Sequence, residues 1–254
     1  MISAITGIGL VAGLLNGLIA IGGGIVIVPG MIRYRQATPQ VAVGTSLGAI
    51  IVLSSVAFVA HFSFSDNFIG ITALVAAVFG GTVGAQVGAW ILASLDSRKM
   101  LILFALFVLF LSLRLLAQGL GFGISTSTIG GIPPMWAFLA VGFVSGVLSG
   151  VFGVGGGAMV LLGLAVFFGL PIDQGITLAL AVNVTNALVG CIRHAKAGRV
   201  LWPDVARLLP AAMIGIALGT TLALRLPADS LRLVFAGFFL FMAIRIGYQA
   251  LKHQ

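Results

Sequence analysis

Acidic side chains are nearly absent from this sequence. Its 254 residues include five acidic residues, all aspartates, and no glutamate. The aspartates lie near the ends of apolar segments, at Asp66, Asp96, Asp173, Asp204 and Asp229. We therefore expect no buried carboxylate that could relay protons or hold a metal. A P-loop, a nucleophile motif and paired acids are also missing, so we expect neither an ATPase nor an enzyme.

Cysteine is equally scarce. Cys191 is the only one, which excludes an internal disulfide framework, and no Cys/His cluster has the spacing of metal ligands. We therefore predict no metal site and no cofactor. The formal net charge is +8, but the 13 basic residues are scattered at segment ends, where membrane topology places such residues. Nucleic acid is therefore not an expected partner.

Apolar residues are abundant instead. The chain is 60% hydrophobic and 7% charged, with a mean hydropathy of +1.24, whereas soluble domains are about 25% charged. Eight apolar segments, each compared with the roughly 20 residues of one helical crossing, lie at 3–32, 42–62, 68–94, 100–118, 135–168, 175–193, 204–224 and 230–250. They are too long for barrel strands and lack the strands' alternating pattern. The predicted fold class is all-α, a polytopic helical bundle in the lipid bilayer.

The two halves of the sequence align at an offset of 133 residues. GLLNGLIAIGGG at residues 13–24 matches GVLSGVFGVGGG at residues 146–157, and His61 matches His194. We interpret this as an internal repeat. Residues 1–118 form the first transmembrane repeat, residues 119–133 a linker, and residues 134–254 the second transmembrane repeat.

The basic residues indicate how the repeats insert. If all eight segments cross once, the two sides hold six and seven basic residues, which is no bias. If the first segment of each repeat enters and leaves on one side, ten basic residues face three. This count favours inverted repeats with both termini in the cytoplasm. A segment of about 30 residues is too short to cross twice, so we predict a broken hairpin.

Three consecutive glycines interrupt the first segment of each repeat. They are Gly22, Gly23 and Gly24 in the first repeat and Gly155, Gly156 and Gly157 in the second. Each glycine costs about 1 kcal/mol in a helix interior, so a break is expected. A helix restarting there would offer N–H groups and a positive dipole end to an anion. Glycines spaced four apart are instead expected to permit close helix packing: Gly13, Gly17, Gly146 and Gly150.

Polar side chains in the second segment of each repeat are further candidates for substrate binding. Thr45 and Ser46 lie in the first repeat, although they could also cap a helix. Asn183 and Asn186 lie on one helical face in the second repeat and are costly to bury without a role. Two weaker candidates are Asn16 and Gln86.

Two histidines and two arginines have competing interpretations. His61 and His194 occupy equivalent positions near segment ends, where an interfacial, solvated role is the commoner explanation and proton handling is the alternative. Arg33 and Arg35 could attract anions to a vestibule, but topology alone also accounts for them.

The sequence resembles the TauE/SafE sulfite exporter family. The resemblance rests on GLLNGLIAIGGGIVIVP and TPQVAVGTS in the first half, and on GVLSGVFGVGGGAMVLLGL and HAKAGRVLW in the second. It covers essentially the whole chain and implies export of sulfite, sulfoacetate or other sulfonates across the inner membrane. The second half departs from the family's repeated Gly-Thr-Ser, because Thr177, Leu178 and Ala179 stand there. That half is expected to use the amides of Asn183 and Asn186 instead.

The leading hypothesis is therefore a secondary transporter that exports small sulfur-containing anions. The anion would lie between the two glycine breaks, and one repeat would rock against the other. The alternative is a passive channel for a small anionic or neutral solute, and a scaffold without transport ranks last. A coupling ion, Na⁺ or H⁺, and a homo-oligomeric state both stay open.

Overall fold

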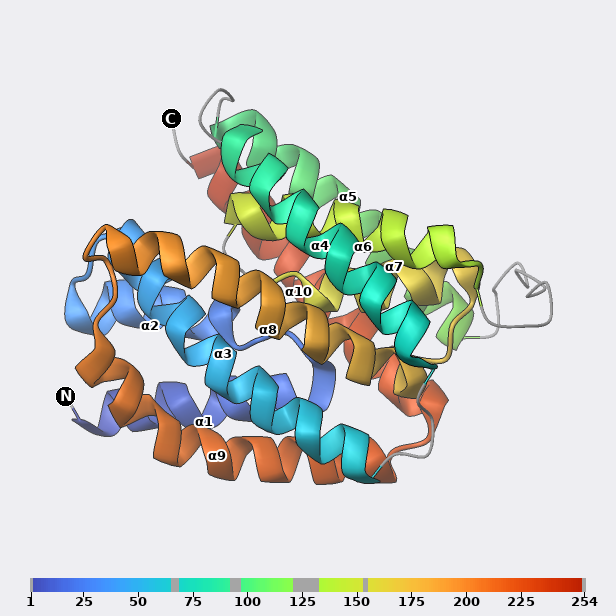
Figure 1. The fold of residues 1–254 in the computed structure, drawn as a ribbon, viewed down its shortest axis with the longest axis horizontal. Helices are drawn as coiled ribbons and strands as arrows, with labels where there is room; N and C mark the ends of the chain where they lie inside the picture. The colour runs from blue at the N-terminus through green and yellow to red at the C-terminus, as the bar shows by residue number, and fades with distance from the viewer. Residues whose placement is uncertain (1, 65–68, 92–96, 121–132, 153–154, 253–254) are drawn as a thin grey trace.

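The computed structural model describes residues 2–64, 69–91, 97–120, 133–152 and 155–252 (Figure 1). Every regular element in these ranges is an α-helix, which confirms the predicted all-α fold class. The helices are α1 (Ile2–Ile19), α2 (Gly24–Arg35), α3 (Pro39–Phe64), α4 (Ile71–Ile91), α5 (Ser97–Gly119), α6 (Met135–Phe152), α7 (Gly157–Phe168), α8 (Ile172–Lys196), α9 (Trp202–Arg225) and α10 (Ala228–Lys252).

The helix bounds follow the apolar segments of the sequence. The first segment of each half is divided in two, into α1 and α2 and into α6 and α7. The second member of each pair begins at the last glycine of its triplet, Gly24 or Gly157, and has 12 residues. The predicted interruption at the glycine triplets is therefore confirmed.

Four helices in the described ranges are long and apolar enough to cross a membrane. The spans are Gln40–Ser63 in α3, Ile71–Gly88 in α4, Gln174–Lys196 in α8 and Trp202–Arg225 in α9. Each half thus contains two of the three full crossings predicted for it. At 1.5 Å per residue, α2 and α7 are about 18 Å long, so neither reaches across a hydrocarbon core of roughly 30 Å.

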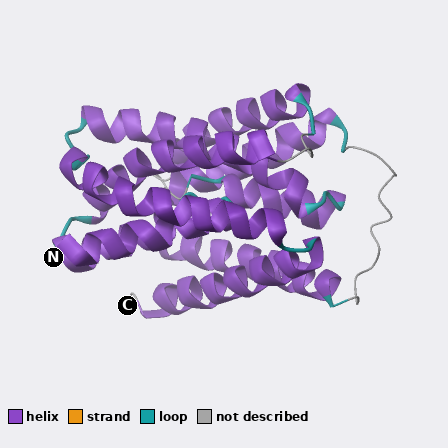
Figure 2. Cartoon of the chain, turned by 90° about the horizontal axis from the view of Figure 1, so that it is seen from below, coloured by secondary structure: helices purple, strands orange, loops and turns teal. Residues whose placement is uncertain are grey.

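Helices from the two halves interlock. α1 packs along α9, and α4 packs along α6, so both interfaces join one half to the other (Figure 1). α3 and α8 lie together at the centre of the bundle, and α5 packs against α10. Figure 2 shows that α1 begins and α10 ends at the same end of the bundle. The predicted linker boundaries at 119–133 stay a prediction, because most of that range is outside the described residues.

Glycines allow the close approach of α1 to α9 and of α6 to α4. Gly13 and Gly17 of α1 face the backbone of α9, and Gly146 of α6 faces the backbone of α4. A Cβ added at Gly13 would overlap the carbonyl oxygen of Ala212. The packing role predicted for these three glycines is therefore confirmed. The surroundings of Gly150 are outside the described part of the chain.

The variant Gly13→Ala is expected to be less stable than the wild type by about 1–3 kcal/mol, the usual range for overpacking a tight contact. Gly7→Ala provides the matched control, because no atom lies within 4 Å of a Cβ added at Gly7 in the same helix. Thermal unfolding in detergent would measure both variants. Equal unfolding temperatures for the two would contradict the packing role.

The first half begins with a hairpin that returns to its starting end. Gly9 of α1 faces Leu208 near the start of α9, and Gly17 faces α9 further along, so α1 and α9 run parallel. At the end of α2, Arg35 pairs with Asp204 in the first turn of α9. The hairpin formed by α1 and α2 therefore begins and ends near the start of α9, as the broken-hairpin prediction requires.

The second half has the same hairpin. Trp136 at the start of α6 meets Phe168 at the end of α7, with ring centroids 5.6 Å apart. The start of α6 and the end of α7 therefore lie side by side, as the start of α1 and the end of α2 do.

The equivalent helices α3 and α8 run antiparallel. Gly44 near the start of α3 faces His194 near the end of α8. Further along α3, Leu47 faces Gly190, which lies earlier in α8. Inverted repeats require this antiparallel relation between equivalent helices.

Candidate functional site

Both breaks place two consecutive glycines in the left-handed region of backbone conformation. Gly22 and Gly23 have φ of 79° and 73°, and Gly155 and Gly156 have φ of 82° and 84°. Only glycine adopts this conformation readily. The third glycine of each triplet is then the first residue of α2 or α7. The triplet thus supplies the turn and the start of the following helix, and it directs both helix N-termini toward the interior.

Asn16 in α1 holds the first break. Its side-chain Oδ1 accepts hydrogen bonds from the Gly22 N–H at 2.7 Å and from the Ser54 hydroxyl of α3 at 3.3 Å. Asn16 is fully buried, and its Nδ2 has no partner among the described residues. The sequence ranked Asn16 as a weak candidate and missed Ser54. The spacing from Ser46 to Ser54, eight residues along one helical face, was the available signal.

Asn183 in α8 joins the two breaks. Its Nδ2 donates to the carbonyl oxygen of Ala20 in the first break at 2.6 Å. Its Oδ1 accepts the N–H of Gly157, the first residue of α7, at 2.7 Å. The side chain is completely buried, and its oxygen and nitrogen both bind backbone groups. Asn183, predicted to bind substrate, therefore lies between the breaks and positions them.

Asn186 and Ser145 lie at the second break. The Nδ2 of Asn186 donates to the Gly155 carbonyl at 3.1 Å, while its buried Oδ1 has no partner among the described residues. The Ser145 hydroxyl donates to the Gly156 carbonyl, and Ser145 also lines a largely apolar cavity of about 370 Å³ between α6 and α7. The sequence did not single out Ser145, although comparison with its equivalent, Ala12, could have done so.

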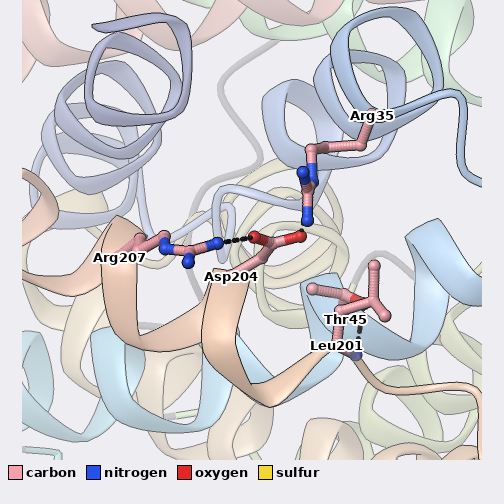
Figure 3. Close-up of polar contacts among 5 residues, drawn as sticks. All are labelled: Arg35, Thr45, Leu201, Asp204 and Arg207. Carbon is pink, nitrogen blue, oxygen red and sulfur yellow. Dashed lines mark hydrogen bonds and ion pairs between the residues drawn. The ribbon is translucent and has the colours of Figure 1, made fainter. Parts of the chain in front are cut away.

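Thr45 and Ser46 lie inside α3. Because α3 begins at Pro39, neither residue caps this helix, and that alternative is wrong. The Thr45 hydroxyl accepts the N–H of Leu201 at 3.0 Å, just before α9 begins (Figure 3). Ser46 is fully buried, and its hydroxyl has no partner among the described residues.

The two histidines have different environments. His61 is 2% exposed, and its Nε2 lies 2.8 Å from the carbonyl oxygen of Gly17. The interfacial, solvated interpretation is therefore wrong for His61, because α1 covers this end of α3. His194 is partly exposed in the last turn of α8, as expected for an interfacial position. Proton handling by either histidine stays a prediction.

Asp204 is a buried carboxylate, contrary to expectation. It is completely buried in the first turn of α9. Its Oδ2 lies 2.7 Å from Nε of Arg35, and its Oδ1 lies 3.0 Å from Arg207 (Figure 3). The residue does lie at a segment end, but the end of α2 covers it. Asp66, Asp96 and the side chains of Asp173 and Asp229 are outside the described part of the chain.

Gln86 and Arg33 lie at the surface. The Gln86 side-chain oxygen accepts a hydrogen bond from Arg193 at 3.3 Å in an exposed pair between α4 and α8. The Arg33 guanidinium stacks over the ring of its neighbour Tyr34, 6.0 Å from the ring centroid.

The fold and the site define a class of protein. Broken helices that meet inside a multi-spanning bundle built from oppositely oriented halves are the arrangement of secondary membrane transporters. The family model described as Sulfite exporter TauE/SafE matches residues 5–246, and the chain belongs to this family. The protein is therefore a multi-pass membrane transporter.

Curated relatives agree with this assignment. The chain is 26% identical over 267 residues to the probable membrane transporter protein YunE of Bacillus subtilis (strain 168), covering 96% of each chain. It is 27% identical over 224 residues to a probable membrane transporter protein of Xylella fastidiosa (strain Temecula1), covering 88% of this chain and 85% of the relative. No solved structure matches the chain.

Proposed function

We propose that this protein is a secondary transporter that exports small sulfur-containing anions, such as sulfite or organosulfonates. It would do so across the cell inner membrane, with both termini in the cytoplasm. The observation that carries the proposal is the meeting of two helix N-termini at a buried centre. α2 and α7 both begin at glycine breaks that Asn183 joins. The family name supports sulfite as a representative substrate.

The chemistry of this centre suits an anion that must also be released. Each helix N-terminus contributes the equivalent of about half a positive charge, directed by backbone N–H groups. Hydroxyls and amides add neutral donors, so the anion is held without a full positive charge. Binding that is favourable enough for entry and weak enough for exit is what transport requires.

Purified protein in proteoliposomes is expected to carry radiolabelled sulfite or a small sulfonate. The flux should saturate with substrate concentration and accelerate when unlabelled substrate is present on the opposite side. A protein that changes shape in each cycle should also turn over at no more than about 10³ per second. Imposed Na⁺ or H⁺ gradients in the same vesicles would identify the coupling ion.

Empty liposomes prepared in parallel are the control for leakage. If the flux in proteoliposomes equals that in empty liposomes for every substrate of this class, the proposal is contradicted. A much faster flux that does not saturate and shows no counter-transport would instead identify a passive channel.

A further inference from the structure

The two glycine breaks differ at one central position. Asn183 of α8 and Ile50 of α3 are separated by 133 residues, so they are equivalent in the two halves. Both side chains lie beside Gly22 and beside Gly155. Their helices, α3 and α8, run antiparallel and pack together (Figure 1). The centre of the molecule therefore has an amide from the second half and an aliphatic side chain from the first.

This difference gives the two helix N-termini different side chains at equivalent positions. At α7, Asn183 supplies an acceptor to the first backbone N–H of the helix, at Gly157. The equivalent N–H at α2 belongs to Gly24, and the equivalent side chain, Ile50, has no hydrogen-bond acceptor. The side-chain oxygen of Asn183 thus occupies the N-terminus of α7. The side chain of Ile50 cannot do the same for α2.

A second donor is available beside the N-terminus of α2. The Oδ1 of Asn16 is fixed by Gly22 and Ser54, which orients the amide at the break. Its Nδ2 is left with two hydrogens and no partner among the described residues, in a side chain that is fully buried. A buried donor without a partner calls for an explanation, and a bound acceptor is the simplest one.

We propose that the transporter has one anion site per chain, at the N-terminus of α2, and that Asn16 is its specificity-determining residue. The inference rests on the proposed function and narrows it to one of the two breaks. The ligand is a small oxyanion with at least two acceptor oxygens, such as sulfite or a sulfonate head group. One oxygen accepts from Nδ2 of Asn16, and another accepts from the first amides of α2. At the equivalent place in the second half, Asn183 acts as an internal substitute for the anion.

Asn16→Asp tests the donor with little change in shape. The carboxylate keeps an acceptor for Gly22 and Ser54 but replaces the free donor with an oxygen that repels an anion. The sulfite concentration giving half-maximal flux is expected to rise at least tenfold. Stabilisation of the detergent-solubilised protein by sodium sulfite should weaken by a similar factor. Ser149→Ala, at the equivalent position of the second half, should change neither measurement.

Ile50→Asn tests the N-terminus of α2 independently of Asn16. The new amide would give α2 the internal acceptor that α7 already has, so the variant should fold normally yet lose sulfite binding by tenfold or more. A monodisperse elution profile would confirm folding. If both variants keep wild-type affinity for sulfite, the inference is overturned.

These results are separable from those that test the proposed function. If the wild type transports sulfite and both variants, Asn16→Asp and Ile50→Asn, bind sulfite as tightly as the wild type, the proposed transport function stands and the single-site inference is contradicted. Sulfite stabilisation that depends on Asn16, without any sulfite flux, would keep the site and remove the transport activity. The absence of both flux and stabilisation would remove both.

Discussion

Replacing Asn183 with leucine is expected to abolish transport and to cause the largest loss of stability of any single change at the breaks. The substitution leaves the Ala20 carbonyl and the Gly157 N–H without their partner in a fully buried region. A buried group left unpaired costs about 1–3 kcal/mol, so the two groups together cost about 2–6 kcal/mol.

Hydrogen bonds between transmembrane helices average only about 0.6 kcal/mol, because the separated partners usually find other acceptors or donors. That lower value does not apply to Asn183. Its partners are backbone groups at the irregular breaks, where the usual helical partner is missing, and the surrounding side chains include the apolar Ile50. The cost should therefore lie in the upper range.

Thermal unfolding in detergent and sulfite flux in proteoliposomes would measure the effect. Asn183→Asp keeps the acceptor for Gly157 and removes only the donor to Ala20, so it should fall between the wild type and the leucine variant. Thr185→Val is the matched control on the same helix, because within the described residues the Thr185 hydroxyl bonds to carbonyls of its own helix. A leucine variant as stable as this control would contradict the role of Asn183.

Replacing Asp204 with alanine is expected to cost about 2–4 kcal/mol. Removing one partner of a buried ion pair typically costs about 3–5 kcal/mol, because the other charge is left uncompensated. The lower figure applies here because the Arg35 side chain is 26% exposed and can reach water after the change. The variant should also release the end of α2 from α9.

A double-mutant cycle of Asp204→Ala and Arg35→Ala would measure the coupling by thermal unfolding. The double variant should be less destabilised than the sum of the single variants. Arg207→Ala should cost under about 1 kcal/mol, since the Arg207 side chain is 56% exposed. If the losses of stability caused by Asp204→Ala and Arg35→Ala simply add, the contact between these residues does not stabilise the packing of α2 on α9.

The sequence predicts the helices and the breaks because both depend on local properties. The length of an apolar segment decides whether it can cross the membrane, and only glycine readily adopts the left-handed conformations of Gly22 and Gly155. These features need no knowledge of distant partners. The predicted segments and glycine triplets therefore coincide with the observed helices and their interruptions.

The environments of Asp204 and His61 could not be predicted in this way. Both residues lie near segment ends, as the sequence indicates, and proximity to an end suggested exposure. Asp204 is covered by Arg35, which lies 169 residues away in the chain, and His61 is covered by Gly17 of α1. Burial at a segment end depends on which other helix packs over that end.

Asn183 shows a similar limit for the site. Its residue type and helical face indicated a polar role inside the membrane, and its partners are indeed at the glycine breaks. The sequence could not show that the chain's own backbone groups use both of its polar atoms. Whether Asn183 binds a substrate or the backbone depends on the packing of α3 against α8, which places Asn183 between two breaks that are distant in sequence.

The interlocking of the halves limits how this transporter can move. Because α1 is seated on α9 and α4 on α6, displacing one repeat as a block would separate two glycine-lined interfaces at once. We therefore expect neither repeat to move as a separate block, which differs from the rocking of one repeat against the other predicted from the sequence. We expect the rigid bodies to be the helix pairs α1–α9 and α4–α6, each with one member from either half. A hinge for alternating access would then lie between these helix pairs, near the two glycine breaks. Movement of one pair would displace the N-termini of both α2 and α7.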